Sequence, residues 1–136
     1  MRLSTRGRYG LAAMIYLGKK YGDNPVSLNE ISKATGLSNN YLEQLIRELK
    51  KQDLVISVRG VQGGYLLKKS PKEISVAEIL ECLEEFFGVT ECSVVPGLCS
   101  REDTCPSRLI WTQMHDDMIN SCLLYTSDAA DDCCRV

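Results

Sequence analysis

Residues 27–51 read SLNEISKATGLSNNYLEQLIRELKK and hold two helical patterns separated by a tight turn. Ser27 and Glu30 have the Ser-x-x-Glu spacing of a capping box, which predicts that a short helix begins there. Gly36 is placed to end that helix in a left-handed conformation, and Ser38 is placed to cap the next helix. The buried stripe expected on this next helix is Leu42, Leu45, Ile46 and Leu49. Together the two patterns predict a helix-turn-helix.

The flanking segments extend this unit into a winged helix-turn-helix. Helical periodicity runs from Thr5 to about Tyr21, where the sequence Gly-Asp-Asn-Pro stops it. The residues at helical spacing are Tyr9, Ala12, Ala13, Tyr16 and Leu17. After the unit, the period becomes strand-like over residues 54–58 and 65–68, and the connection RGVQGG predicts a hairpin tip. We therefore expect a mainly α fold with a small β-hairpin wing, with residues 1–70 as its first domain.

The second half of the chain carries two further helical patterns. A second capping box, Ser75-Val76-Ala77-Glu78, opens a helix that is expected to run through Phe87. No periodicity survives over residues 88–106, so this stretch is predicted to be a loop. The last helix begins near Pro106, and its stripe is Trp111, Met114, Met118 and Cys122. We expect this long C-terminal helix to make a dimer contact, and we group residues 71–123 as a second unit.

Charge is distributed unevenly along the 136 residues. The net charge is −2, but residues 1–70 carry +7 and residues 71–136 carry −9. The first half is therefore suited to binding a polyanion.

The composition is that of a globular protein. Apolar residues at 44% and charged residues at 25% exclude a disordered or collagen-like chain. The longest apolar stretch, residues 10–18, is too short to span a membrane, and no secretory signal is evident. We therefore expect a cytoplasmic protein, in which seven cysteines favour metal or redox chemistry over disulfides.

The exposed face of the helix ending near Lys51 carries side chains that suit double-stranded DNA. Amides pair with adenine and carboxylates with the amino group of cytosine. The candidates for reading bases are Asn40, Tyr41, Glu43 and Gln44. Cationic side chains bind phosphates and position the protein; the candidates are Arg47, Lys50 and Lys51. At the hairpin tip, Arg59 and Gly60 suit a minor groove. The alternative is a small helical core that serves protein contacts.

Three cysteines lie in the predicted loop, Cys92, Cys99 and Cys105, with the spacing C-x6-C-x5-C. Thiolates are soft ligands that suit iron–sulfur clusters and zinc. A zinc site usually has a shorter C-x2–4-C knuckle, which is missing here. The alternative is that these are ordinary half-buried thiols. Cys82 and Cys122 fall within helical patterns and are expected to pack rather than to bind metal.

These motifs resemble the Rrf-two family of dimeric winged-helix transcription regulators. The resemblance covers residues 1 to about 123, and its motifs are MRLSTRGRY (1–9), LEQL (42–45), the wing RGVQGGYLL (59–67) and the three-cysteine loop. Within the family the chain is most similar to regulators of iron–sulfur cluster assembly. The resemblance implies that Tyr41, Glu43 and Gln44 contact bases and that Arg59 and Gly60 belong to the wing. It also implies a homodimeric repressor that holds a 2Fe–2S cluster on the three loop cysteines. Two recognition helices related by a two-fold axis would read a pseudo-palindromic operator.

The chain departs from the family pattern at the position of the fourth cluster ligand. The assembly regulators have a histidine three residues after the third cysteine, where this chain has Arg108. The nitric-oxide sensors take an aspartate near the N-terminus, where this chain has Arg8. The first cysteine gap is also one residue longer than usual. The fourth ligand therefore stays open, and the candidates are His115, Glu102, Asp103 and a bound small molecule.

The last residues match neither the helical stripe nor the family. Residues 124–136 read LYTSDAADDCCRV. We interpret this tail as translated sequencing-adapter read-through, so Cys133 and Cys134 are poor candidates for ligands. Resequencing the locus and finding the same codons would contradict this interpretation.

Three functions are compatible with this sequence. The first is a homodimeric regulator in which loss or oxidation of the cluster reshapes the cysteine loop and shifts the two DNA-binding halves. The second is a regulator of the same family without a cluster, which responds to cysteine or sulfur metabolism through its thiols or a partner protein. The third is a small iron–sulfur electron carrier. The sequence shows neither a nucleophile–base set nor a phosphate-binding loop that would indicate an enzyme.

Overall fold

The computed structural model describes residues 3–124. The elements of the first half are α1 (Thr5–Lys19), α2 (Leu28–Thr35), α3 (Asn39–Lys51), β1 (Val55–Val58) and β2 (Gly64–Leu67). Those of the second half are the 3-10 turn η1 (Pro71–Glu73), α4 (Val76–Leu83), α5 (Glu91–Val94) and α6 (Arg108–Leu124). The strands pair antiparallel. This architecture confirms the expected mainly helical fold with a hairpin wing.

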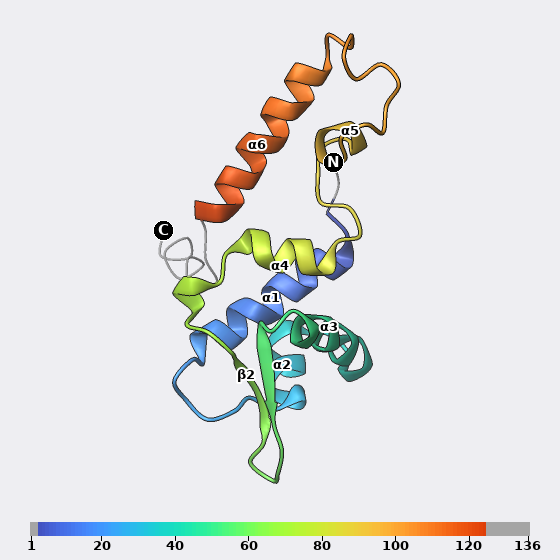
Figure 1. The fold of residues 1–136 in the computed structure, drawn as a ribbon. Helices are drawn as coiled ribbons and strands as arrows, with labels where there is room; N and C mark the ends of the chain where they lie inside the picture. The colour runs from blue at the N-terminus through green and yellow to red at the C-terminus, as the bar shows by residue number, and fades with distance from the viewer. Residues whose placement is uncertain (1–2, 125–136) are drawn as a thin grey trace.

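The hairpin and the cysteine loop lie at opposite ends of the molecule. Figure 1 shows the hairpin at the bottom, α5 and α6 at the top, and α1 and α4 crossing between them. Helix α4 contacts α1, α3 and α6, so it links the helix-turn-helix to the upper part of the molecule. Within residues 3–124, none of the helices combines the length and apolar character needed to span a bilayer.

The helix-turn-helix forms as its sequence predicts. The Ser27 hydroxyl accepts the Glu30 N–H at 3.1 Å, and the Ser38 hydroxyl accepts the Tyr41 N–H at 3.3 Å. Gly36 ends α2 with φ of 77°, the left-handed conformation that glycine adopts without strain. All four residues of the expected stripe on α3 are buried, and they pack against Ala13, Met14 and Leu17 of α1. These contacts determine which face of α3 is exposed to solvent.

The wing is anchored to the helical core by one extra backbone bridge. Val55 pairs with Leu67 at the base of the hairpin, and Val58 pairs with Gly64 near its tip. Val26, just before α2, exchanges two hydrogen bonds with Tyr65, at 3.0 and 2.8 Å. This bridge fixes the wing relative to the helix-turn-helix.

Gly64 is the position at which the wing is most sensitive to substitution. A Cβ atom there would lie 2.4 Å from the Val26 carbonyl oxygen, a backbone atom that no side-chain rotation can move away. We expect Gly64→Ala to lower the free energy of unfolding by about 1–3 kcal/mol, the usual cost of overpacking. Urea denaturation measures this change, and the exposed neighbour Gln62→Ala is the control. A Gly64→Ala protein as stable as the control would contradict the close approach at Val26.

The second half differs from the sequence expectation in two places. Helix α4 ends at Leu83 rather than Phe87, because Glu84 is extended and its Oε1 accepts hydrogen bonds from the Ser4 N–H (3.0 Å) and hydroxyl (2.9 Å). The predicted loop contains the short helix α5, which begins after Thr90. The Thr90 N–H donates to the Ser93 hydroxyl at 3.2 Å, and that hydroxyl donates to the Thr90 carbonyl at 2.7 Å.

The two terminal helices also differ in detail. Helix α1 ends at Lys19, and its buried residues are Gly7, Gly10, Ala13, Met14 and Leu17. Tyr9 and Ala12, which fit the predicted periodicity, are exposed, because α4 approaches α1 over its glycines. Helix α6 continues to Leu124, two residues beyond the end of the predicted stripe. The rest of the predicted atypical tail, residues 125–136, lies outside the described residues.

Candidate DNA interface and cysteine loop

The exposed face of α3 presents most of the predicted DNA-contacting side chains. The exposed members are Asn40, Glu43, Gln44, Arg47, Lys50 and Lys51. Tyr41 differs, because its ring stacks edge-on against Tyr9 of α1 with 6.1 Å between the ring centroids. Its hydroxyl is buried and has no hydrogen-bond partner in the described residues. In this structure Tyr41 therefore packs between helices instead of standing on the outer face.

Several polar side chains at this face anchor α3 to its neighbours. Asn39 donates to Asn29 of α2 at 2.8 Å, which ties the two helices of the motif together. Lys50 donates to the Ser57 hydroxyl of β1 at 3.1 Å, which ties α3 to the wing. Lys51 pairs with Glu48 one turn away, at 3.1 Å. Among the predicted phosphate ligands, Lys50 and Lys51 thus also make contacts within the protein.

A hollow separates α3 from the wing. Its volume is about 380 Å³, and its lining is Glu43, Ile46, Arg47, Lys50, Lys51 and Tyr65. At the wing tip, Arg59 is exposed and Gly60 has φ of 116°, a conformation that favours glycine. Val61, next to them, is fully exposed. Exposed apolar side chains can contact sugars or base steps in DNA complexes; Val61 is not among the candidates predicted from the sequence.

The three loop cysteines are free thiols in different surroundings. Cys92 is half-buried on α5, with its Sγ 3.2 Å from the Thr90 hydroxyl. Cys99 is exposed. Cys105 is half-buried just before α6, and the hydrogen bond with the Ser107 hydroxyl, at 3.2 Å, lowers the pKa of its thiol. Within residues 3–124, no three His, Cys, Asp or Glu side chains are grouped as a metal site, so the described arrangement does not gather these thiols.

The candidates for a fourth ligand have distinct places in the structure. Arg108 on α6 forms an ion pair with Glu102, and both side chains are partly buried. Asp103 is exposed. His115 is half-buried on α6, and its Nδ1 is a buried atom without a hydrogen-bond partner in the described residues. A Cβ at Gly88 would lie 3.5 Å from that nitrogen, so the ring faces the segment that leads to α5.

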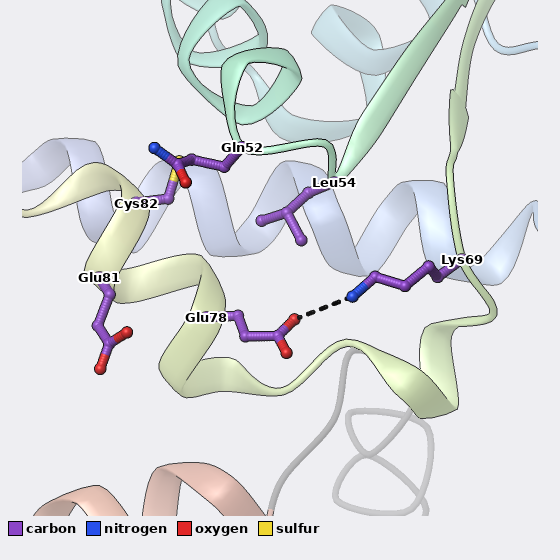
Figure 2. Close-up of a pocket in the computed structure, with 6 residues that line it drawn as sticks. All are labelled: Gln52, Leu54, Lys69, Glu78, Glu81 and Cys82. Carbon is purple, nitrogen blue, oxygen red and sulfur yellow. Dashed lines mark ion pairs between the residues drawn. The ribbon is translucent and has the colours of Figure 1, made fainter.

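Cys82 lies apart from the loop, on α4. Its thiol donates to the Glu48 carbonyl of α3 at 3.3 Å, and burial raises its pKa. Figure 2 shows it at the edge of a hollow of about 390 Å³ between α4 and the end of α3. Across the same hollow, Lys69 pairs with Glu78 at 3.7 Å. On α6, burial likewise raises the pKa of the half-buried Cys122.

Comparison with known proteins agrees with this geometry. The family model Rrf2, described as an iron-dependent transcriptional regulator, matches residues 3–126. The chain belongs to the Rrf2 family. The HTH-type transcriptional regulator IscR of Pectobacterium carotovorum is 39% identical over 127 residues, which are 91% of this chain and 77% of the relative. This Rrf2 protein is thus a DNA-binding transcriptional regulator, and its relatives are regulators rather than enzymes.

Two solved structures share the fold along nearly the whole chain. The IscR structure from T. potens superposes with a TM-score of 0.79 at 35% identity, covering 98% of this chain and 88% of that one. The structure of CymR, the global cysteine regulator of B. subtilis, has a TM-score of 0.82 at 38% identity, covering 96% of this chain and 97% of that one. The likeness to IscR and CymR confirms the family resemblance of the sequence.

Proposed function

We propose that this Rrf2 regulator senses iron–sulfur or redox status through a cluster held by Cys92, Cys99 and Cys105, and that this state sets its affinity for an operator. The observation that carries the proposal is that three free thiols lie in the segment from α5 to the start of α6, which Figure 1 shows well away from the recognition helix α3. The description of the family as iron-dependent supports it. A function as an electron carrier has no support among the relatives.

The donor chemistry of the loop fits an iron–sulfur group. Three thiols are the soft ligands that such clusters require, and the lowered pKa of Cys105 favours its thiolate. Because the thiols are not gathered in this structure, binding requires the loop to draw together. Once bound, the group supplies a centre that responds to oxidants and to iron supply; 2Fe–2S is the type that the family resemblance implies.

Contacts between helices give the loop a route to the DNA-binding surface. Helix α6 contacts α5 and α4, and α4 contacts both α1 and α3. The Cys82 thiol joins α4 to the recognition helix, and Glu84, at the end of α4, holds Ser4 at the start of α1. A change in the loop can therefore shift α4, and with it the orientation of α3. Such a coupling needs a free-energy difference of about 1–3 kcal/mol in DNA binding between the two states.

We assign residues 1–70 as the DNA-binding domain and residues 71–123 as the sensing and dimerisation unit. Within the first, Asn40, Glu43 and Gln44 read bases, Arg47 and Lys50 bind phosphates, and Arg59 with Gly60 forms the groove-contacting wing tip. Tyr41 supports this surface from below, in keeping with its packing on Tyr9. The target is a duplex operator with pseudo-twofold symmetry, since a symmetric dimer presents two recognition helices. We propose that binding there represses transcription.

We assign the contact between the two protomers of the dimer to α6. The exposed apolar side chains of this helix are Leu109, Ile110, Met114 and Leu123. Exposed apolar side chains concentrated on one helix are typical of a surface that a partner covers. Figure 1 shows α6 standing away from the helix-turn-helix, so a second copy can approach it.

Charges placed on α6 are expected to separate the protomers. Ile110 and Met114 are 56% and 47% exposed and lie one turn apart, so Ile110→Lys with Met114→Lys leaves the fold of the protomer intact. We expect the dimer dissociation constant to rise at least about a hundredfold, because a lysine buried without a partner costs several kcal/mol. Sedimentation velocity measures this, with the exposed polar Asn120→Lys as control. A variant that stays dimeric at low concentration would place the dimer contact elsewhere.

Anaerobic purification tests the proposed cofactor. We expect a coloured protein with visible absorbance and with iron and acid-labile sulfide in equal amounts. A colourless, iron-free protein from cells supplied with iron and sulfur, also after anaerobic reconstitution, would contradict the proposal.

One observation favours the second candidate, a cluster-free regulator that responds through its thiols. The CymR likeness is to a protein described as a global cysteine regulator. The exposed Cys99 and the Cys105 thiol with its lowered pKa are suited to reversible oxidation. Operator binding that changes with thiol oxidation in a protein that never takes up iron would identify this function.

A further inference from the structure

Glu102 is the residue around which the cysteine loop closes. Its Oε2 accepts a hydrogen bond from the Gly97 N–H at 2.6 Å, and its Oε1 forms the ion pair with Arg108. The guanidinium also donates to the Glu102 carbonyl at 3.5 Å. The Glu102 side chain is 18% exposed, whereas every other residue from 94 to 104 is exposed. We call these three residues the Glu102 clamp.

The rest of this segment has little else to hold its shape. Its apolar residues Val94, Val95 and Leu98 are 39%, 47% and 54% exposed, and none belongs to the hydrophobic core, although Val94 lies against Gly88. The backbone hydrogen bonds from 99 to 108 join residues three or four apart, such as Cys105 N–H to Arg101 O at 2.8 Å. The clamp alone, within the described part of this loop, connects residue 97 to α6. A segment with little apolar burial opens easily unless such polar contacts hold it.

We propose that Glu102 and Arg108 are positioning residues for the loop thiols, and that Glu102 closes the loop instead of serving as the fourth ligand. The clamp spans the stretch that contains Cys99 and Cys105, so it limits how far apart these two thiols can move. Arg108 stands where the assembly regulators have a histidine, but a guanidinium stays protonated and cannot ligate a metal. Position 108 thus contributes to loop geometry in this chain. The role of the clamp in sensing rests on the proposed function. Its effect on the conformation of the loop does not, because it can be measured in the metal-free chain.

The test uses the full-length, metal-free protein and measures the loop directly. Alkylation of each cysteine is followed by mass spectrometry, together with amide hydrogen exchange over residues 96–106. Glu102→Ala is expected to raise the alkylation rate of Cys105 and the exchange rate of the loop about tenfold, as expected for loss of a charge-assisted contact. The matched control is Asp103→Ala, which removes the same charge from an exposed neighbour and is expected to leave both rates near those of the wild type.

Two milder variants separate the parts of the clamp. Glu102→Gln can still accept from Gly97 but loses the ion pair, and Arg108→Ala removes the ion pair while keeping the carboxylate. Both are expected to give increases smaller than that of Glu102→Ala, and they decide the result if Glu102→Ala fails to fold. Rates at the wild-type level in the folded Glu102 variants, or equal increases in Asp103→Ala, would overturn the proposal.

Iron and sulfide analysis of the wild type keeps the two proposals distinguishable. If the wild type takes up no cluster while Glu102→Ala still loosens the loop, the clamp stands and the proposed sensing function fails. If the cluster assembles and Glu102→Ala leaves the metal-free loop unchanged, the clamp is wrong and the sensing function stands. If the wild type assembles the cluster and the metal-free loop loosens in Glu102→Ala but not in Asp103→Ala, both proposals stand.

Discussion

Replacing Glu43 and Gln44 by alanine is expected to lower affinity for the preferred operator by about a hundredfold while leaving weak binding to unrelated duplexes nearly unchanged. Both side chains are exposed on α3 and can reach base edges. Each base-reading side chain contributes about 1–3 kcal/mol of discrimination, and binding to any sequence comes from phosphate contacts. The operator is obtained by selection from random duplexes with the wild-type protein. Fluorescence anisotropy then measures both affinities at several salt concentrations.

The matched control is Arg47→Ala, on the same exposed face. Because Arg47 is assigned to a phosphate, this change should weaken binding to all duplexes similarly and reduce the salt slope by about one. Loss of discrimination in Arg47→Ala but not in the Glu43 and Gln44 variant would reverse the assigned roles. Equal discrimination in all three proteins would place base reading on another surface.

Replacing Cys92, Cys99 and Cys105 together by alanine is expected to reduce bound iron and sulfide to background. The operator affinity of this variant should equal that of the wild-type protein after its cluster is removed. The reason is that we assign these three thiolates as the ligands, and the described loop offers no other soft donors between α5 and α6. Iron and sulfide assays on anaerobically prepared protein give the first result, and anisotropy with the selected operator gives the second.

Cys82→Ala and Cys122→Ala are the controls, because both cysteines lie outside the loop. Burial raises the pKa of each thiol, which makes each a poorer ligand. We expect both variants to keep the cluster. Iron lost equally from all cysteine variants would indicate general destabilisation, and iron kept by the triple variant would show that other residues hold it.

The helix-turn-helix could be predicted from the sequence because its signals are local. Ser27, Gly36 and Ser38 act within three or four residues of themselves, and the stripe on α3 has a clear helical period. The strands were bounded by a tip with three glycines, so their pairing followed from proximity in the chain. The candidate residues for DNA contact followed from the opposite face of the same helix, and the structure exposes all of them on α3 except Tyr41.

The differences arise where distant residues decide the local structure. Helix α4 stops early because the carboxylate of Glu84 is held by Ser4, eighty positions away in the chain. Tyr41 turns inward because Tyr9 lies beside it, which helical periodicity cannot reveal. The exposure of Tyr9 itself follows from α4 packing on Gly7 and Gly10. None of these contacts can be recognised from the residues next to the position whose structure it alters.

The same contrast between local sequence signals and contacts set by the fold holds for the cysteine loop. Its three thiols were evident from their spacing, but Glu102 looked only like an oxygen ligand close to them. The fold places Glu102 between Gly97 and Arg108, where both of its carboxylate oxygens are engaged. The short helix α5 was missed because four residues are too few to show a period, although Thr90 and Ser93 supply its capping contacts.

We propose that the state of the loop thiols and their cluster sets operator affinity. The most direct measurement is operator binding by the anaerobically purified protein before and after oxidation, with iron and sulfide determined on the same samples. The two states are predicted to differ in affinity by at least about fivefold, the lower end of typical coupling. An affinity that stays the same while the cluster is lost would contradict the claim.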